Sequence, residues 1–154
     1  MGLHNRNKTT IRAFRSALYD FDRGRLSRVV KDVFDPGCAV HLANPFEDLD
    51  GPGALLDQAF FPLTNAIPDL ERRDTIVIAG NAVGQDWVGC AGYYTGLFER
   101  PWLRIPPTHH QVSLRFHEFY RMEGGKVIEM QALWDIPEVM MQARAWPMAP
   151  SVGR

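Results

Sequence analysis

The segment from His117 to Asp135 constrains the fold of this chain more than any other stretch. Its sequence, HEFYRMEGGKVIEMQALWD, places two runs rich in apolar residues on either side of Gly124 and Gly125. A glycine pair adopts the positive φ angles of a tight hairpin turn without steric cost. The segment therefore predicts an antiparallel hairpin, with strands over residues 111–122 and 127–134.

Along the rest of the chain, the spacing of the hydrophobic residues changes once, from a helical pattern to a strand-like pattern. Ile11, Phe14, Leu18 and Phe21 recur at helical spacing, and the same spacing returns further along. From Leu70 onward, β-branched and aromatic residues favour strands instead. The pattern predicts helices over residues 11–21, 26–34, 55–63 and 136–146, and further strands over residues 38–42, 75–79 and 86–98.

Helices followed by a run of antiparallel strands are typical of an α+β domain, in which helices cover one face of a sheet. Glycines within the strand over residues 86–98 mark bulges or bends. We therefore expect a cone-shaped, cystatin-like α+β roll: a strongly bent, mixed or antiparallel sheet whose concave face is covered by the N-terminal helices. The length of 154 residues fits one domain, with a core over about residues 8–145.

Both faces of the hairpin are rich in apolar residues, so both need cover. Helices supply one cover, and a second copy of the chain can supply the other. We therefore expect a homodimer that forms through the outer face of the sheet. With a two-residue turn, the expected register puts Phe116, Glu118, Tyr120, Gln131 and Leu133 on one face, and His117, Phe119, Met130, Ala132 and Trp134 on the other.

Composition argues against several classes of function. The formal net charge is −1, which does not favour a nucleic-acid or anionic-membrane surface. No apolar run approaches the roughly 20 residues of a membrane span, so we expect a cytoplasmic protein. Cys38 and Cys90 lie in apolar surroundings, and we expect them to be buried and reduced. Motifs such as CxxC and HExxH are absent from the sequence, so we expect no metal and no other cofactor.

His117 and Glu118 are the candidate catalytic residues. A regular strand points adjacent residues to opposite faces, so only one of the two should line the cavity. Acid–base catalysis needs an ionisable group that reaches the substrate. Either residue can instead be structural: His117 as a hydrogen-bonded histidine in the core or an interface, and Glu118 as the ion-pair partner of Arg115 or Arg121. The sequence leaves these alternatives open.

Other polar and aromatic residues are candidates for substrate binding. His41 and Asn44 stand at the exit of the first short strand, where a polar pair either lines the rim of the cone or only stabilises a turn. Asp135 precedes the sequence Ile-Pro-Glu, so it is either a site residue or the cap of the last helix. The remaining candidates for the pocket wall are Trp87, Tyr94, Phe98, Phe119, Gln131 and Trp134.

Four segments resemble a known family. They are Arg15–Leu18, the IPPT motif at residues 105–108, the strand and turn HEFYRMEGGKV, and the closing LWD at residues 133–135. Together they resemble the SnoaL-like polyketide cyclases of the nuclear transport factor 2-like superfamily. The resemblance implies a cone-shaped α+β domain that closes a polyketide ring by aldol condensation without metal or cofactor. It also implies an aspartate as acid/base, aided by a polar neighbour such as histidine.

Carried over position by position, the family's catalytic aspartate falls on Ala132, its helper histidine on Glu118 and its later aspartate on Asp135. Alanine transfers no proton, and losing acid–base catalysis lowers a rate by about 10²–10⁴-fold. Two hypotheses follow. The first is a cofactor-independent ester or polyketide cyclase, or a related lyase or isomerase, that acts on a small apolar or polyketide-like molecule through Glu118 and His117. The second is a non-catalytic domain that binds a small ligand or dimerises.

Overall fold

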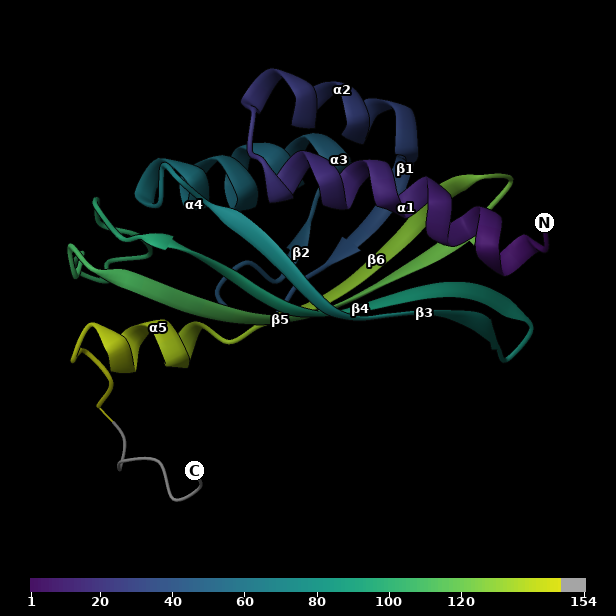
Figure 1. Ribbon diagram of the computed structural model, residues 1–154. Helices are drawn as coiled ribbons and strands as arrows, with labels where there is room; N and C mark the ends of the chain where they lie inside the picture. Colours follow the sequence, from purple (N-terminus) through teal and green to yellow (C-terminus); the bar gives the residue numbers. More distant parts are fainter. Residues whose placement is uncertain (148–154) are drawn as a thin grey trace.

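A six-stranded bent sheet lies at the centre of the molecule (Figure 1). The computed structural model describes residues 1–147. The elements in chain order are α1 (Leu3–Tyr19), α2 (Arg23–Val33), β1 (Phe34–His41), β2 (Asp48–Leu49), α3 (Gly51–Ala54), the π-helix η1 (Leu55–Phe60), α4 (Phe61–Ala66), β3 (Glu71–Ala82), β4 (Gln85–Leu97), β5 (Gln111–Glu123), β6 (Lys126–Trp134) and α5 (Ile136–Gln142). The strands lie in the order β2-β1-β6-β5-β4-β3, with β1 parallel to β6 and the other neighbours antiparallel. The expected mixed α+β sheet is confirmed.

The helices cover the two faces of the sheet unequally. The helices from α1 to α4 lie over one face, whereas α5 lies on the other face (Figure 1). Helix α1 buries Ile11, Phe14 and Leu18, which recur at i, i+3 and i+7 and so form one apolar stripe. Cover of one face by the N-terminal helices, as expected from the sequence, is therefore confirmed. The opposite face is covered by α5 only beside β5.

The helical segment expected over residues 55–63 is longer and divided. It runs from Gly51 to Ala66 as α3, η1 and α4. Pro62 falls in the first turn of α4, directly after η1, so the helical segment continues through the proline instead of ending there. The segment contributes the buried side chains of Leu55, Phe60 and Leu63 to the core.

The register expected for the β5–β6 hairpin is wrong by one residue. Met122 pairs with Val127, but Arg121 pairs with Glu129, so Ile128 is an extra residue in β6. Such a bulge exchanges the two faces of the strand beyond it. The inner face therefore holds Phe116, Glu118, Tyr120, Met130, Ala132 and Trp134, and the outer face holds His117, Phe119, Gln131 and Leu133.

Both cysteines are buried free thiols, as expected from the sequence. Burial raises the pKa of Cys38 to about 12, and nearby carboxylates add to that effect. Burial likewise raises the pKa of Cys90 to about 12, although the Arg72 guanidinium acts in the opposite direction. Both thiols therefore stay protonated, and poor nucleophiles, near neutral pH. Among residues 1–147, no helix is long and apolar enough to cross a membrane.

Gly92 lies where the backbones of β3 and β4 approach each other closely. It pairs with Asp74 beside a bulge in β3. A Cβ atom added at Gly92 would lie 1.9 Å from the backbone oxygen of Arg73. Backbone atoms cannot rotate out of the way as a side chain can. The close approach beside the bulge therefore requires a glycine at position 92.

We predict that Gly92→Ala destabilises the fold by about 2 kcal/mol or more, because the strand pair must separate locally. Gly80→Ala is the matched control, since a Cβ there has no neighbour within 4 Å. That substitution should be neutral or stabilise by up to about 1 kcal/mol, because alanine loses less entropy on folding. Urea unfolding followed by circular dichroism measures both values, and equal stabilities of the two variants would contradict the close approach.

Candidate functional site

A buried ion pair lies at the centre of the inner face of the sheet. Nη1 of Arg72, on β3, lies 2.6 Å from Oε2 of Glu118, on β5, and both side chains are fully buried. The two strands are separated by β4, so the long side chains meet across its inner surface. Desolvating two charges costs several kcal/mol each, and only close pairing and further hydrogen bonds offset that cost.

The Glu118 carboxylate is saturated with hydrogen-bond donors. Oε1 accepts from the hydroxyl of Tyr94 at 2.8 Å and from Nε1 of Trp134 at 3.0 Å. Oε2 accepts from Arg72 at 2.6 Å and from the hydroxyl of Tyr120. A carboxylate offers about four lone-pair sites, so these donors occupy its whole accepting capacity. In this arrangement Glu118 has no lone pair left for a substrate proton.

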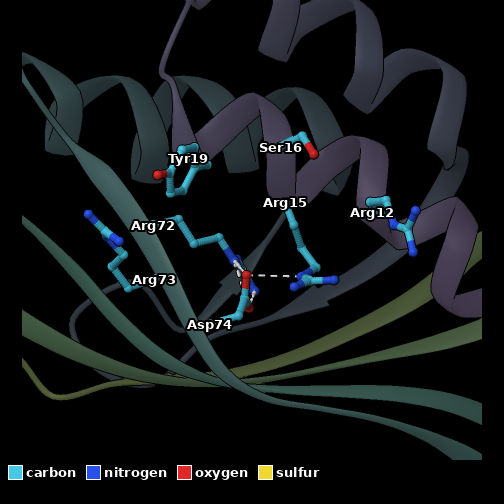
Figure 2. Close-up of a pocket in the computed structure, with 7 residues that line it drawn as sticks. All are labelled: Arg12, Arg15, Ser16, Tyr19, Arg72, Arg73 and Asp74. Carbon is cyan, nitrogen blue, oxygen red and sulfur yellow. Dashed lines mark hydrogen bonds and ion pairs between the residues drawn. The ribbon is translucent and has the colours of Figure 1, made fainter.

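Asp74 and Arg15 extend the network from the interior to the surface. Arg72 donates to both carboxylate oxygens of Asp74, through Nε at 3.1 and 3.2 Å and through Nη2 at 3.1 Å. Nε of Arg15, on α1, donates to Oδ2 of the same aspartate at 2.9 Å. Figure 2 shows these three side chains meeting between α1 and β3. The order of charges from the core outward is Glu118, Arg72, Asp74 and Arg15.

Burial and charge set the protonation states within this network. Burial acts to lower the pKa of Arg72, but the Glu118 carboxylate, with smaller contributions from neighbouring groups, holds that pKa well above its usual value. Burial also raises the pKa of Tyr94 well above its usual value, against the opposing effect of Arg72. The pKa of Tyr120 is raised by burial and by the Glu118 carboxylate. The arginine is therefore a fixed cation, and both tyrosines are neutral donors.

Aromatic rings surround the network. The Arg72 guanidinium lies 4.2 Å from the centroid of the Phe116 ring, a distance typical of cation–π contact. Edge-on and tilted contacts link these rings, and their centroids lie 4.8–6.3 Å apart. The rings in these contacts are Phe14, Phe34, Phe46, Phe60, Tyr94, Trp102, Phe116, Tyr120 and Trp134. Small-molecule sites are typically walled in this way, with few polar groups among apolar ones.

The turn between β1 and β2 and the loop between β4 and β5 meet beside this aromatic interior. Phe46, in the turn, contacts Trp102, in the loop, with ring centroids 6.3 Å apart, and Trp134 at 5.5 Å. Trp102 is buried, and its Nε1 has no hydrogen-bond partner among the described residues. A buried indole N–H without a partner is unusual. The three rings, Phe46, Trp102 and Trp134, are called the aromatic rim below.

The structure brings together only some of the residues selected from the sequence. Tyr94, Phe98 and Trp134 are buried, and Tyr94 and Trp134 bind Glu118. His117 points to the outer face, so the adjacent pair is divided between the two faces as strand geometry requires. Trp87, Phe119 and Gln131 line a hollow of about 430 Å³ on the outer face. A second outer hollow, of about 410 Å³, is lined by His117, Trp134 and Asp135 among others.

The remaining candidates form local contacts. Asp135 accepts a hydrogen bond from the backbone N–H of Glu138 at 3.2 Å and so caps α5. Nδ1 of His41 lies 2.6 Å from Asp48 of the neighbouring strand β2. The exposed side chain of Asn44 donates to Glu47 at 3.2 Å within the turn. Among residues 1–147, no group of three or more His, Cys, Asp or Glu side chains is arranged to hold a metal ion.

Sequence reasoning did not select Arg72, Asp74, Arg15 or Tyr120 for the site. One signal was available: ERRD, at the start of β3, places opposite charges two residues apart, so that Arg72 and Asp74 share a face of the strand. This spacing alone does not show that the face turns inward. An ion pair between Glu118 and an arginine was one of the alternatives that the sequence left open, but the partner is Arg72 and not Arg115 or Arg121.

We predict that Arg72→Met destabilises the fold by about 3–5 kcal/mol, because it leaves the Glu118 carboxylate buried without its cation. Arg73→Met is the matched control on the same strand: Arg73 pairs with Glu71 at 2.7 Å in a half-exposed position, and its loss should cost no more than about 1 kcal/mol. The double variant Arg72→Met, Glu118→Gln should be more stable than the sum of the two single losses. Urea unfolding of Arg72→Met, Arg73→Met, Glu118→Gln and the double variant measures the four losses of unfolding free energy. If the loss in the double variant equalled the sum of the losses in Arg72→Met and Glu118→Gln, Arg72 and Glu118 would not be coupled.

Comparison with known proteins places this geometry in context. The family model described as SnoaL-like polyketide cyclase matches residues 9–143. A comparison with curated protein sequences gives no significant match. Among solved structures, AclR, a putative hydroxylase from Streptomyces galilaeus, superposes with a TM-score of 0.78 at 17% identity, over 97% of this chain and 91% of AclR. A putative SnoaL-like polyketide cyclase from Jannaschia sp. CCS1 gives a TM-score of 0.75 at 22% identity, over 96% of this chain and 97% of its own.

A third solved structure, the putative polyketide cyclase IdmH from Streptomyces antibioticus, gives a TM-score of 0.72 at 16% identity, over 88% of this chain and 96% of IdmH. Identities this low show a shared fold. The family model, in contrast, spans nearly the whole described chain, including the hairpin that carries Glu118. The chain belongs to the SnoaL-like polyketide cyclase family.

Proposed function

We propose that this protein binds a small, mostly apolar, polyketide-like molecule against the aromatic inner face, and that Glu118 anchors the wall of that site instead of moving a proton. The observation that carries the proposal is the saturation of Glu118 by Arg72, Tyr94, Tyr120 and Trp134. A general base needs a free lone pair within reach of the substrate. Family membership supports the ligand class.

The aromatic rim is the proposed entrance to this site. Phe46 belongs to a short turn and Trp102 to a loop, and such connections move more readily than strands. Phe46 contacts Trp134, which in turn contacts the ring of Tyr94, so displacing Phe46 and Trp102 would open a path toward these two rings. The N–H of Trp102, which has no partner among residues 1–147, then becomes available to a ligand carbonyl. Side chains of a single chain form the whole of the proposed entrance.

A second candidate function is cofactor-independent cyclase chemistry with Glu118 as the base. Two observations favour it. Glu118 pairs directly across the strands with Ala132, the position on which the family's aspartate falls, so a carboxylate is present on the neighbouring strand. The network also contains strongly shifted pKa values, and such groups cluster at functional sites. For this chemistry Glu118 must first give up one of its donors. His117, on the outer face, then takes no part.

The two candidate functions differ in whether the bound compound is converted to a ring-closed product. A panel of polycyclic β-keto esters is titrated against the protein by calorimetry, and ring closure is followed by mass spectrometry. We expect saturable binding by at least one compound, with a rate of ring closure equal to background for wild type and for Glu118→Gln. Ring closure by wild type that falls about 10²–10⁴-fold in Glu118→Gln would instead establish Glu118 as a base.

Variants of the rim and of the outer face test where the compound binds. His117→Gln changes the outer face and should leave affinity for the same compound unchanged. Trp102→Phe removes the N–H of the rim but keeps an aromatic ring, and should weaken binding if a carbonyl accepts from that N–H. Trp87→Phe is its matched control on the outer face. Equal effects of the Trp102 and Trp87 substitutions would place the ligand elsewhere.

We also propose that the protein forms a homodimer through the outer face of the sheet. Large apolar side chains lie exposed there, and Ile78 and Leu133 are each 58% exposed. Phe119 and Trp87 border the same hollow. Apolar surface of this kind on one face usually marks an interface. Free buried cysteines also fit the cytoplasmic location that we propose for this protein.

Light scattering at micromolar concentration tests the dimer. We expect a mass of twice the 17.5 kDa of one chain. Phe119→Glu should shift the protein toward the monomer, because it places a charge within the apolar face. Leu3→Glu, at an exposed apolar position of α1 away from that face, should leave the mass unchanged. A monomeric mass for wild type would refute the proposal.

A further inference from the structure

Positive charge gathers in the groove between α1 and β3 (Figure 2). The groove has a volume of about 440 Å³ and is lined by Arg12, Arg15, Arg72 and Arg73, with Asp74 as the carboxylate of its lining. The whole chain carries a formal net charge of −1. The basic groove is therefore a local concentration of charge on a nearly neutral protein.

The arginines differ in how far other groups neutralise them. Arg73 pairs with Glu71 at 2.7 Å, and its guanidinium lies 5.3 Å from the centroid of the Tyr19 ring. Arg72 is neutralised by Glu118 and shares Asp74 with Arg15. Within residues 1–147, the exposed side chain of Arg12 forms no ion pair or hydrogen bond, and Arg15 forms none through its Nη atoms. The unbalanced charge thus lies at the Arg12–Arg15 end.

The geometry of α1 brings a third donor to this end. Arg12, Arg15 and Ser16 stand at i, i+3 and i+4, so their side chains emerge from one face of the helix. All three line the groove. Two guanidinium groups beside a hydroxyl suit an anion with several acceptor oxygens and more than one charge. A phosphate group has three such oxygens and a charge near −2, whereas a carboxylate has two oxygens and one charge.

We propose that the Arg12–Arg15 end of this groove binds the phosphate group of a small phosphate ester or diphosphate. Asp74 separates this site from the aromatic interior, and Arg12 and Ser16 take no part in the buried network. The phosphate site therefore stands independently of the function proposed for the interior. Because Arg15 keeps its bond to Asp74 through Nε, its Nη atoms can bind the anion without breaking the chain of ion pairs.

Calorimetric titration of the full chain with inorganic phosphate, pyrophosphate and acetate, at constant ionic strength, tests the site. We expect saturable binding of phosphate and pyrophosphate, with a dissociation constant of about 1 mM or tighter, and none of acetate. Arg12→Gln should weaken binding about tenfold, the loss typical of one charge-assisted hydrogen bond. Arg15→Lys, which keeps the charge but removes the planar fork, should also weaken it.

Two variants control for general loss of charge. Arg73→Gln removes a neutralised arginine from the same groove, and Arg28→Gln removes an exposed one from α2; both should bind pyrophosphate as wild type does. No saturation up to about 10 mM would overturn the proposal. So would equal losses in the Arg12 and Arg28 variants, acetate binding as tight as phosphate binding, or preference for a single-stranded oligonucleotide over pyrophosphate. Unchanged melting temperatures show that the variants are folded.

Discussion

The structure depends on the buried ion pair between Arg72 and Glu118. Through it and its hydrogen bonds, β3, β4, β5 and β6 are connected at one point, and Asp74 and Arg15 connect that point to α1. Charges placed in an aromatic core are stable only when every donor and acceptor is paired. The strands must therefore hold their register and bend closely, since a small shift leaves a charge without a partner.

Local irregularities in the strands make this pairing possible. The extra residue Ile128 turns Trp134 and Ala132 to the inner face, so that the indole N–H reaches Glu118. The bulge in β3 opposite Gly92 brings its backbone against β4. Neither irregularity adds a strong interaction of its own. Each places side chains from different strands within hydrogen-bonding distance, which regular strands with the same sequence cannot do.

The sequence resemblance bears on the same network. It places the family's aspartate on Ala132, and in the structure Glu118 stands directly across the strands from that position. That carboxylate is held by an arginine and two neutral tyrosines. In the function that we propose, this carboxylate is a fixed anchor of the inner face and not a mobile base. The fold is shared with proteins described as putative polyketide cyclases, and a fold by itself does not determine the chemistry of its site.

The sequence by itself determined the presence of the helices but not their ends, and it determined the hairpin with its Gly124–Gly125 turn, the α+β class and the buried state of both cysteines. Hydrophobic period and turn chemistry are local properties, whereas the ends of the helices depend on packing. The sequence also narrowed the chemistry to His117 and Glu118. Only the tertiary structure decided which of the two faces inward, because β5 carries apolar residues on both faces and its sequence does not show which face the helices cover. One bulged residue also reverses the facing of β6, and no local pattern marks it. The partner of Glu118 lies 46 residues away along the chain. The bend of the sheet, which no single segment encodes, brings the two charges together.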